Sequence, residues 1–179
     1  MKLKEKFEKE IKQELAKELG LKNMMSVPTL SKITINAGIG DALKDSKILD
    51  LMLEDITGIA GQKAVIAKSR QDISNFNRLK KGDKIGVYVT LRGEKMWSFF
   101  DKLVSVVLPG VRDFRGVSRK SFDGSGNYNL GFKQHSVFPE VDQNRLDKAR
   151  GIQITVQTSA RENDPAYALL KKLGMPFRD

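Results

Sequence analysis

The sequence contains no cysteine and only one histidine in 179 residues. The absence of cysteine excludes disulfide scaffolds, thiol nucleophiles and thiolate zinc sites, and it fits a reducing compartment. The lone His135 lacks the second imidazole or the cysteine that would support a metal site or a nucleophilic constellation. The carboxylates are scattered without the paired spacing that would hold magnesium. We therefore predict no metal site, no cofactor and no enzymatic activity.

The sequence also lacks any long apolar run. Its first 20 residues alternate Lys and Glu with isolated apolar residues, and no later segment approaches the roughly 20 apolar residues of a membrane span. We expect no signal peptide, a soluble protein and no membrane partner.

Positive charge is in excess. The chain carries 32 Lys and Arg against 22 Asp and Glu, a formal net charge of +10, and its hydrophobic content of 40% suffices for one buried core. Residues 1–179 are therefore predicted to form a single domain. The charge favours nucleic acid or another anionic surface as the partner.

Four segments have the periodicity of amphipathic helices. The first places an apolar residue at every fourth position and ends at Gly20; because its charges nearly balance, we expect it to dock on the protein's own core. The second follows a possible cap at Ser46, and the third, residues 94–108, should bury Trp97 and Phe100. In the last, Asp164 is the expected cap and Gly174 should lie just past the end.

Alternating apolar and polar residues predict strands near residues 31–37, 64–67, 85–91, 128–132 and 152–157. Together with the helices they predict an α+β fold, a mainly antiparallel β-sheet with helices packed on one face and the other face polar and RNA-facing. The polar face would present Lys32, Thr34, Asn36, Tyr88, Thr90, Arg92, Gln153, Thr155 and Gln157. This set is poor in aromatics but rich in groups suited to sugars, phosphates and a shallow minor groove. The alternative is a solvated face with no partner.

Two segments between these elements are strongly basic. The extended loop 68–84 holds six cationic residues and one aromatic, Phe76. The stretch 112–128 combines the cations Arg112, Arg115, Arg119 and Lys120 with three glycines and with Phe114, Phe122 and Tyr128. Its aromatics and glycines either serve a polyanionic partner or pin a solvated loop to the core, while Asp123 before Gly124 is typical of a turn.

The basic segments and the polar sheet face together favour binding of a structured RNA. Two alternatives belong to other classes. A non-ribosomal RNA-binding regulator would need only the basic surface, and an RNA-processing enzyme would need magnesium-dependent turnover.

Several motifs carry a resemblance that runs nearly end to end. They are LRGEKMWSFFDKL (91–103), RDFRG (112–116), KSFDGSGNY (120–128), FPE (138–140), RGIQITVQTSA (150–160) and GMPF (174–177). In this order they resemble the bacterial large-subunit ribosomal protein number five family.

The resemblance implies a structural constituent of the large ribosomal subunit, located in the cytoplasm. That family binds 5S rRNA in the central protuberance beside a segment of 23S rRNA. It lies among other 5S-binding large-subunit proteins, and it contacts the P-site tRNA and a small-subunit head protein.

The resemblance also implies roles for particular residues. Asn36, Gln62 and Thr90 match the family's 5S contacts, so the predicted RNA-binding residues are Lys32, Thr34, Asn36, Gln62, Tyr88, Thr90, Arg92, Arg112, Arg115, Arg119 and Lys120. The loop 68–84 resembles the family's tRNA-contacting finger, here with Arg70, Phe76, Arg78, Lys80 and Lys81. This chain departs from the family at Ala64, where proline is usual, and at Gln71 and Asp72, where a basic pair is usual.

Overall fold

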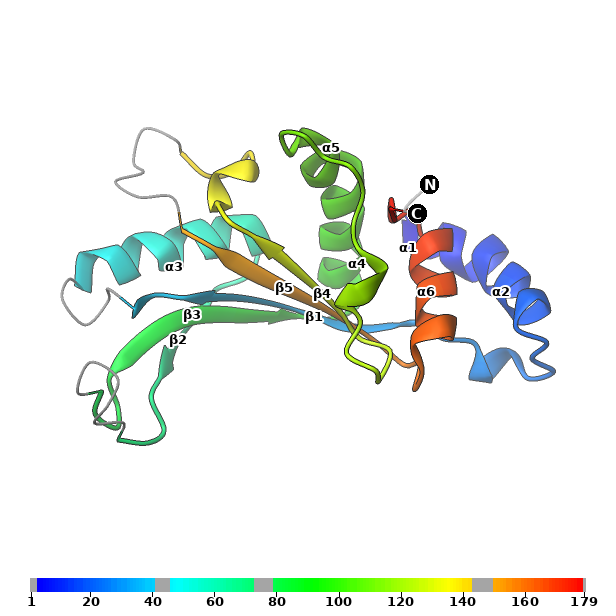
Figure 1. The fold of residues 1–179 in the computed structure, drawn as a ribbon, viewed down its shortest axis with the longest axis horizontal. Coiled ribbons are helices and arrows are strands. Elements are labelled where there is room, and N and C mark those ends of the chain that lie inside the picture. The colour runs from blue at the N-terminus through cyan, green and yellow to red at the C-terminus, as the bar shows by residue number, and fades with distance from the viewer. Residues whose placement is uncertain (1–2, 41–45, 73–78, 143–149, 179) are drawn as a thin grey trace. The chain divides into compact units, whose positions relative to one another are not determined.

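The computed structural model of the chain describes residues 3–40, 46–72, 79–142 and 150–178 (Figure 1). In these residues a five-stranded antiparallel sheet has the strand order β2-β3-β1-β5-β4. Helices accompany the sheet, so the α+β fold class predicted from the sequence is confirmed.

The elements coincide closely with the predicted segments. The strands are β1 Leu30–Gly38, β2 Val65–Lys68, β3 Lys84–Leu91, β4 Tyr128–Phe132 and β5 Ile152–Thr158. The helices are α1 Leu3–Lys6, α2 Lys12–Glu18, α3 Ser46–Ala60, α4 Gly93–Lys102, α5 Leu108–Gly110 and α6 Asn163–Lys172. The side chain of Ser46, the expected cap of α3, lies outside the described residues.

The chain divides into two compact units. Unit 1 contains Met1–Ile33, Leu91–Leu130 and Thr155–Asp179, and unit 2 contains Thr34–Thr90 and Gly131–Ile154. Strands β1, β3, β4 and β5 contribute residues to both units. The single domain expected from chain length stays a prediction.

In unit 2 the core lies between α3 and one face of the strands. Figure 1 shows α3 along that face. The helix buries Leu49, Met52, Ile56 and Ile59, and the strands bury residues that include Ile35, Val87, Val89, Ile152 and Ile154. Each such side chain contributes about 1.5–3 kcal/mol when it is fully removed from water. The buried residues alternate with more exposed ones along β1 and β3, as the sequence predicted.

In unit 1 the first helical segment docks through its apolar stripe, as predicted. A π-helical turn, Phe7–Ile11, joins α1 to α2 without a break. In a regular α-helix, residues spaced by four drift around the axis by about 40° per repeat. A π-helical turn is wider and advances less per residue, which offsets part of that drift. Phe7, Ile11 and Leu15 are accordingly all buried.

The second helical segment of unit 1 supplies the bulkiest apolar side chains. A π-helical turn, Leu103–Val107, joins α4 to α5. Phe100 is fully buried, and Trp97 is 8% exposed with its ring centroid 5.2 Å from that of Phe7. The expectation that these aromatics belong to the core is confirmed.

The start of α6 differs from the sequence prediction. The helix begins at Asn163, and Glu162 occupies the N-cap position without a side-chain capping bond. The prediction that Asp164 is the cap is therefore wrong, because Asp164 lies inside the first turn, where its carboxylate accepts a hydrogen bond from Arg119 at 2.8 Å. Gly174 does follow the helix end with a φ of 92°, as predicted.

Among the described residues, no helix has both the length and the apolar character needed to cross a membrane.

Gly86 on β3 provides a test of how tightly β1 and β3 are fitted. A Cβ atom at this position would lie 2.5 Å from the carbonyl oxygen of Ala37, so an alanine would force the backbone of β1 or β3 to move. We predict that Gly86→Ala lowers the free energy of unfolding by about 1–3 kcal/mol, measured by urea denaturation. Gly131→Ala on β4 is the matched control, because a Cβ there meets nothing within 4 Å. Equal stability of the two variants would contradict this account of the close approach.

Candidate nucleic-acid interface

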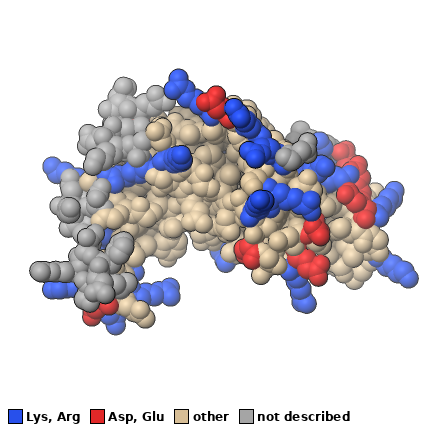
Figure 2. Space-filling view, in the orientation of Figure 1, with Lys and Arg blue, Asp and Glu red and all other residues tan. Residues whose placement is uncertain are grey.

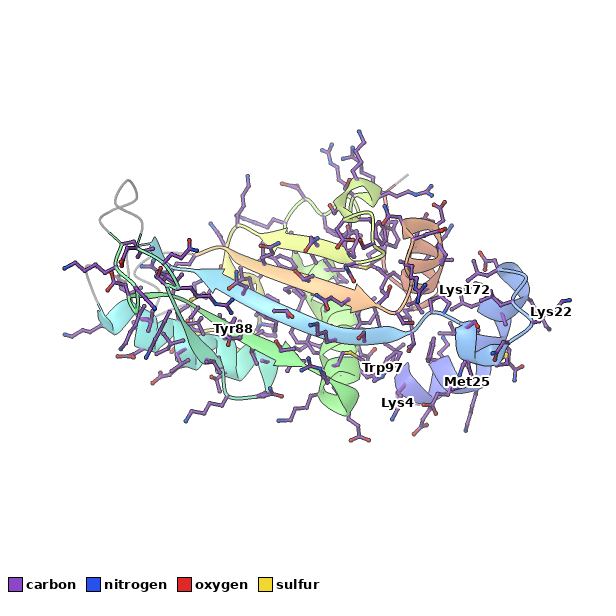
Figure 3. All side chains as sticks on the ribbon, turned by 90° about the horizontal axis from the view of Figure 1, so that it is seen from below. Lys4, Lys22, Met25, Tyr88, Trp97 and Lys172 are labelled. Carbon is purple, nitrogen blue, oxygen red and sulfur yellow. The ribbon has the colours of Figure 1, made fainter. Side chains whose placement is uncertain are left out.

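The polar face of unit 2 lies on the side of the strands away from α3. Asn36 and Tyr88 are exposed and Thr34 and Thr90 are half-buried, whereas their chain neighbours Ile35, Val87 and Val89 are buried. Figure 3, turned to view the molecule from below, shows the strands of this unit in front of α3 with Tyr88 on them. These four predicted polar side chains on β1 and β3 thus share one face. The fifth predicted polar residue of the unit 2 strands, Gln153 on β5, is exposed between the buried Ile152 and Ile154.

The register of β1 and β3 sets these side chains side by side. The Ile39 amide donates to the Ile85 carbonyl at 2.9 Å. In a regular antiparallel ladder, this bond places Asn36 opposite Tyr88 and Thr34 opposite Thr90. Directly opposite residues share a face, with Cβ atoms about 5 Å apart, so the two pairs form adjacent rows.

Gln62 joins this group from outside the strands. Gly61, with a φ of 60°, ends α3, and the Gln62 side-chain amide then donates from Nε2 to the Thr90 carbonyl at 3.1 Å. This bond fixes the amide beside Thr90 and leaves Oε1 as an acceptor. The structure therefore brings together two predicted residues that are 28 positions apart in the sequence. Periodicity gave no sign of this contact; only the family resemblance had singled out Gln62.

Unit 1 carries two further predicted contacts, and it pairs the predicted polar-face residue Thr155 with Asn129, which the sequence analysis missed. Lys32 on β1 is half-buried and Arg92, which follows β3, is exposed. Thr155 on β5 donates its hydroxyl to Asn129 Oδ1 at 2.8 Å. Asn129 alternates with the apolar residues of β4, and this periodicity was the signal that could have identified it.

The basic stretch 112–128 lies in unit 1, and its cations fall into two groups. Figure 2 shows Lys and Arg side chains gathered over α5 and the segment that follows it. Arg112, Arg115 and Lys120 are exposed. Arg119, in contrast, pairs with Asp164 and places its guanidinium 4.5 Å from the centre of the Tyr167 ring. It therefore already has protein partners.

The aromatics of this stretch pack on the protein. Tyr128 is fully buried and its hydroxyl donates to the Ser118 carbonyl at 2.8 Å. Burial raises the pKa of the Tyr128 hydroxyl. Phe122 contacts the Tyr128 ring edge to face, with 4.8 Å between ring centroids, and Phe177 stacks beyond it. For Phe122 and Tyr128, the alternative in which aromatics pin the loop to the core is the one observed.

Two of the glycines in the stretch likewise serve contacts within the protein. A Cβ on Gly116 would lie 2.9 Å from the Arg178 nitrogen, and one on Gly126 would lie 2.6 Å from the Ala160 carbonyl oxygen. The Asn163 side chain accepts from the amides of both Gly124 and Gly126. Asn163 was missed by the sequence analysis because its partners lie nearly 40 residues away.

Asp123 forms the turn that the sequence predicted. Its Oδ1 accepts from the amides of Ser125 and Asn127, and its Oδ2 accepts from the Asn127 side chain at 2.8 Å. The side-chain bond from Asn127 is the main reason that the pKa of the Asp123 carboxyl is lowered. These bonds rigidify the turn that leads into β4.

The basic loop 68–84 is described only at its base. Ser69 and Asp83 join the two sides through a backbone bond of 2.8 Å, and the carboxylates of Asp72 and Asp83 accept from the amides of Lys81 and Lys80. Arg70, Lys80 and Lys81 are exposed. Phe76 and Arg78, two of the predicted tRNA contacts, lie outside the described residues.

His135 has a structural position in unit 2. It is 1% exposed, its Nδ1 accepts from the Arg150 amide at 3.1 Å, and its Nε2 lies 3.3 Å from Asp55 Oδ2. Both ring nitrogens therefore have partners. In the part of the chain that the structure describes, no three His, Cys, Asp or Glu residues are grouped as metal ligands.

Comparison with known proteins identifies the family. The model described as "Ribosomal protein L5" matches residues 23–77, and the model for the C-terminus of the same ribosomal protein family matches residues 84–177. The chain is 51% identical to large ribosomal subunit protein uL5 of Roseiflexus castenholzii over 177 residues, which cover 99% of this chain and 98% of the relative. It is also 51% identical to the uL5 proteins of Anaeromyxobacter sp. strain Fw109-5 (98% and 97% covered) and Geobacter sulfurreducens (98% of both chains covered).

These relatives are structural ribosomal proteins, a family not known as enzymes. The matches span nearly the whole of both chains and confirm the resemblance found in the sequence motifs. The chain therefore belongs to the L5 family of ribosomal proteins, which are constituents of the large ribosomal subunit.

Proposed function

We propose that this chain binds 5S rRNA in the central protuberance of the large subunit, beside a segment of 23S rRNA. The observation that supports this most directly is the polar face of unit 2. There Thr34, Asn36 and Thr90 share one face, and Gln62 is hydrogen-bonded to the backbone of Thr90. Neutral donors and acceptors held on rigid strands are suited to the 2′-hydroxyls and base edges of a wide, shallow RNA minor groove.

The exposed cations supply the second part of the proposed interface. Arg112, Arg115 and Lys120 are exposed in unit 1, and Arg92 is exposed after β3. Cationic side chains of this kind contact phosphates and set overall affinity, whereas the neutral contacts provide selectivity. Arg119 already donates to Asp164, whose carboxylate offsets its charge, so we give it the smaller part.

Two further contacts belong to the same proposal. The loop 68–84 contacts the P-site tRNA, and the base of this loop holds Arg70, Lys80 and Lys81 exposed. The stretch 112–128 contributes to rRNA contact or to the contact with a small-subunit head protein. In this arrangement the chain lies among the other 5S-binding proteins and acts as a non-catalytic scaffold.

A competition titration tests the central proposal. The purified protein is titrated with 5S rRNA and with a structured RNA of equal length and unrelated sequence, across a salt series. We expect a preference for 5S rRNA that persists at high salt, because neutral contacts are not screened. Affinities that are equal for both RNAs and that fall together with salt would refute specific recognition.

The neutral contacts can be tested one at a time. We predict that Asn36→Ala and Thr90→Ala each weaken 5S rRNA binding by roughly 1–3 kcal/mol, because each leaves an RNA group without its partner. The measurement is a filter-binding titration. Gln13→Ala on α2 is the control, since it removes an exposed amide in unit 1. Wild-type affinity in both face variants, with folding intact by circular dichroism, would rule out this face.

The tRNA contact requires a separate measurement. We predict that the double variant Lys80→Gln and Lys81→Gln keeps its 5S rRNA affinity to within about 2-fold at moderate salt, but lowers P-site tRNA occupancy on reconstituted ribosomes. The substitutions should leave the base of the loop folded, because Asp83 and Asp72 bond the backbone amides of Lys80 and Lys81 and not their side chains. Only the two positive charges are removed. Unchanged tRNA occupancy would count against this loop as the tRNA contact.

A further inference from the structure

Tyr88 differs from the other aromatic residues that the structure describes, because it alone is exposed. Its exposed fraction is 40%, whereas the rings of the 112–128 stretch are buried or half-buried. Among the described residues, no aromatic ring or cation packs on the Tyr88 ring. Figure 3 shows Tyr88 on the strands of unit 2, on the face away from α3.

The neighbours of Tyr88 in the sheet extend its surface in two chemically different ways. Val65 on β2 is its direct antiparallel partner and is 52% exposed. On the other side, the β1–β3 register places the exposed amide of Asn36 opposite Tyr88. A row across three strands therefore presents an apolar side chain, an aromatic ring and a hydrogen-bonding amide, in that order.

The positive charge nearby suits a phosphate. Lys63 and Val65 are exposed on either side of the buried Ala64, so alternation places Lys63 on the same face as Val65 and Tyr88. Lys68 and Lys84 are also exposed, but they pair beyond a register shift between Ala67 and Lys68, and Lys68 is three residues from Val65, which places it on the other face. The surroundings of the ring are thus complementary to a polyanion and not to an apolar protein segment.

We propose that the Tyr88 ring stacks on one unpaired base of the bound RNA. Val65 enlarges the stacking surface, the Asn36 amide lies at the edge of that base, and Lys63 takes an adjoining phosphate. The proposal rests on the proposed function and deepens it, since it assigns a single-stranded nucleotide to a face that otherwise fits a helical groove. Unstacked bases in loops and bulges are the usual targets of sequence-specific RNA recognition.

A purely structural role for the ring predicts something different. Cross-strand pairs such as Tyr88 with Val65 stabilise a sheet by about 0.2–1 kcal/mol. If that were the whole role, replacing the ring would change stability and leave RNA affinity unchanged. Stacking of a base on an aromatic side chain, in contrast, contributes roughly 1–3 kcal/mol to binding.

The first experiment compares Tyr88→Phe with Tyr88→Leu in 5S rRNA titrations across a salt series. Phenylalanine keeps the ring and should bind within about 2-fold of wild type. Leucine removes it and should weaken binding about 5- to 140-fold. The slope of log affinity against log salt should stay unchanged, since stacking releases no counterions, whereas Lys63→Gln should reduce it by up to about 0.9.

Leu51→Ala is the matched control. Leu51 is 39% exposed, almost the same as Tyr88, but it lies on α3 and not on the strands. It should bind 5S rRNA like wild type. Leucine and phenylalanine variants of Tyr88 that bind equally well would overturn the proposal while leaving the 5S preference of the wild type, and hence the proposed function, intact.

A direct readout does not depend on 5S rRNA. Tyr88→Trp places an indole on the exposed face, and the native Trp97, 8% exposed in unit 1, serves as the internal reference. Single-stranded oligoadenylate should quench the fluorescence of the variant and leave that of the wild type unchanged, and a duplex RNA of equal length should quench neither. Absence of quenching by the single strand would overturn the stacking site. This outcome is independent of whether the protein prefers 5S rRNA.

Discussion

The pleat of the strands is the constraint on which the polar face depends. Successive side chains of a strand point to opposite faces, so a one-residue slip would exchange the buried and exposed sets. Burial of Ile35, Val87 and Val89 on the α3 side therefore determines that Asn36, Tyr88 and Thr90 point the other way. The close approach of Gly86 to the Ala37 carbonyl further restricts the register. The hydrophobic core of unit 2 therefore orients polar side chains that are not part of it.

Charge is organised on a different principle from the neutral face. Some cations have partners in the protein, as Arg119 has in Asp164 and Lys172 in Glu14. The Lys172 ammonium lowers the pKa of the Glu14 carboxyl, and the pair is exposed, so solvent screening limits its effect on stability. Others, such as Arg112, Arg115 and Lys120, extend into solvent. The total of 32 Lys and Arg thus overstates the number of cations ready to meet a phosphate, and only the structure separates the two groups.

Periodicity in the sequence was enough to predict the elements and the fold class, because strands and helices with one buried face repeat at fixed intervals. It also placed Asn36 and Thr90 on the polar face. Periodicity could not predict contacts between residues that are distant in the sequence. Such contacts join separate elements, as in the bond from Gln62 to Thr90, the two amides bonded to Asn163 and the pairing of Arg119 with Asp164. The wrong cap at Asp164 has the same origin, since a tertiary partner and not the helix terminus decides what its carboxylate does.

The aromatic residues show why composition alone misleads about stacking surfaces. The stretch 112–128 contains three aromatics among its cations, a composition typical of nucleic-acid contact, yet Tyr128 is fully buried and Phe122 packs against it. The polar strand face was expected to be poor in aromatics, and it carries the one ring of the described residues that is exposed. An aromatic side chain in a basic loop gains more from burying its area against the protein than from remaining in water. A tyrosine on the outward side of a strand cannot bury its ring against the protein in this way, because the pleat holds the ring in solvent. Exposure imposed by secondary structure is therefore a better guide to a stacking surface than aromatic content.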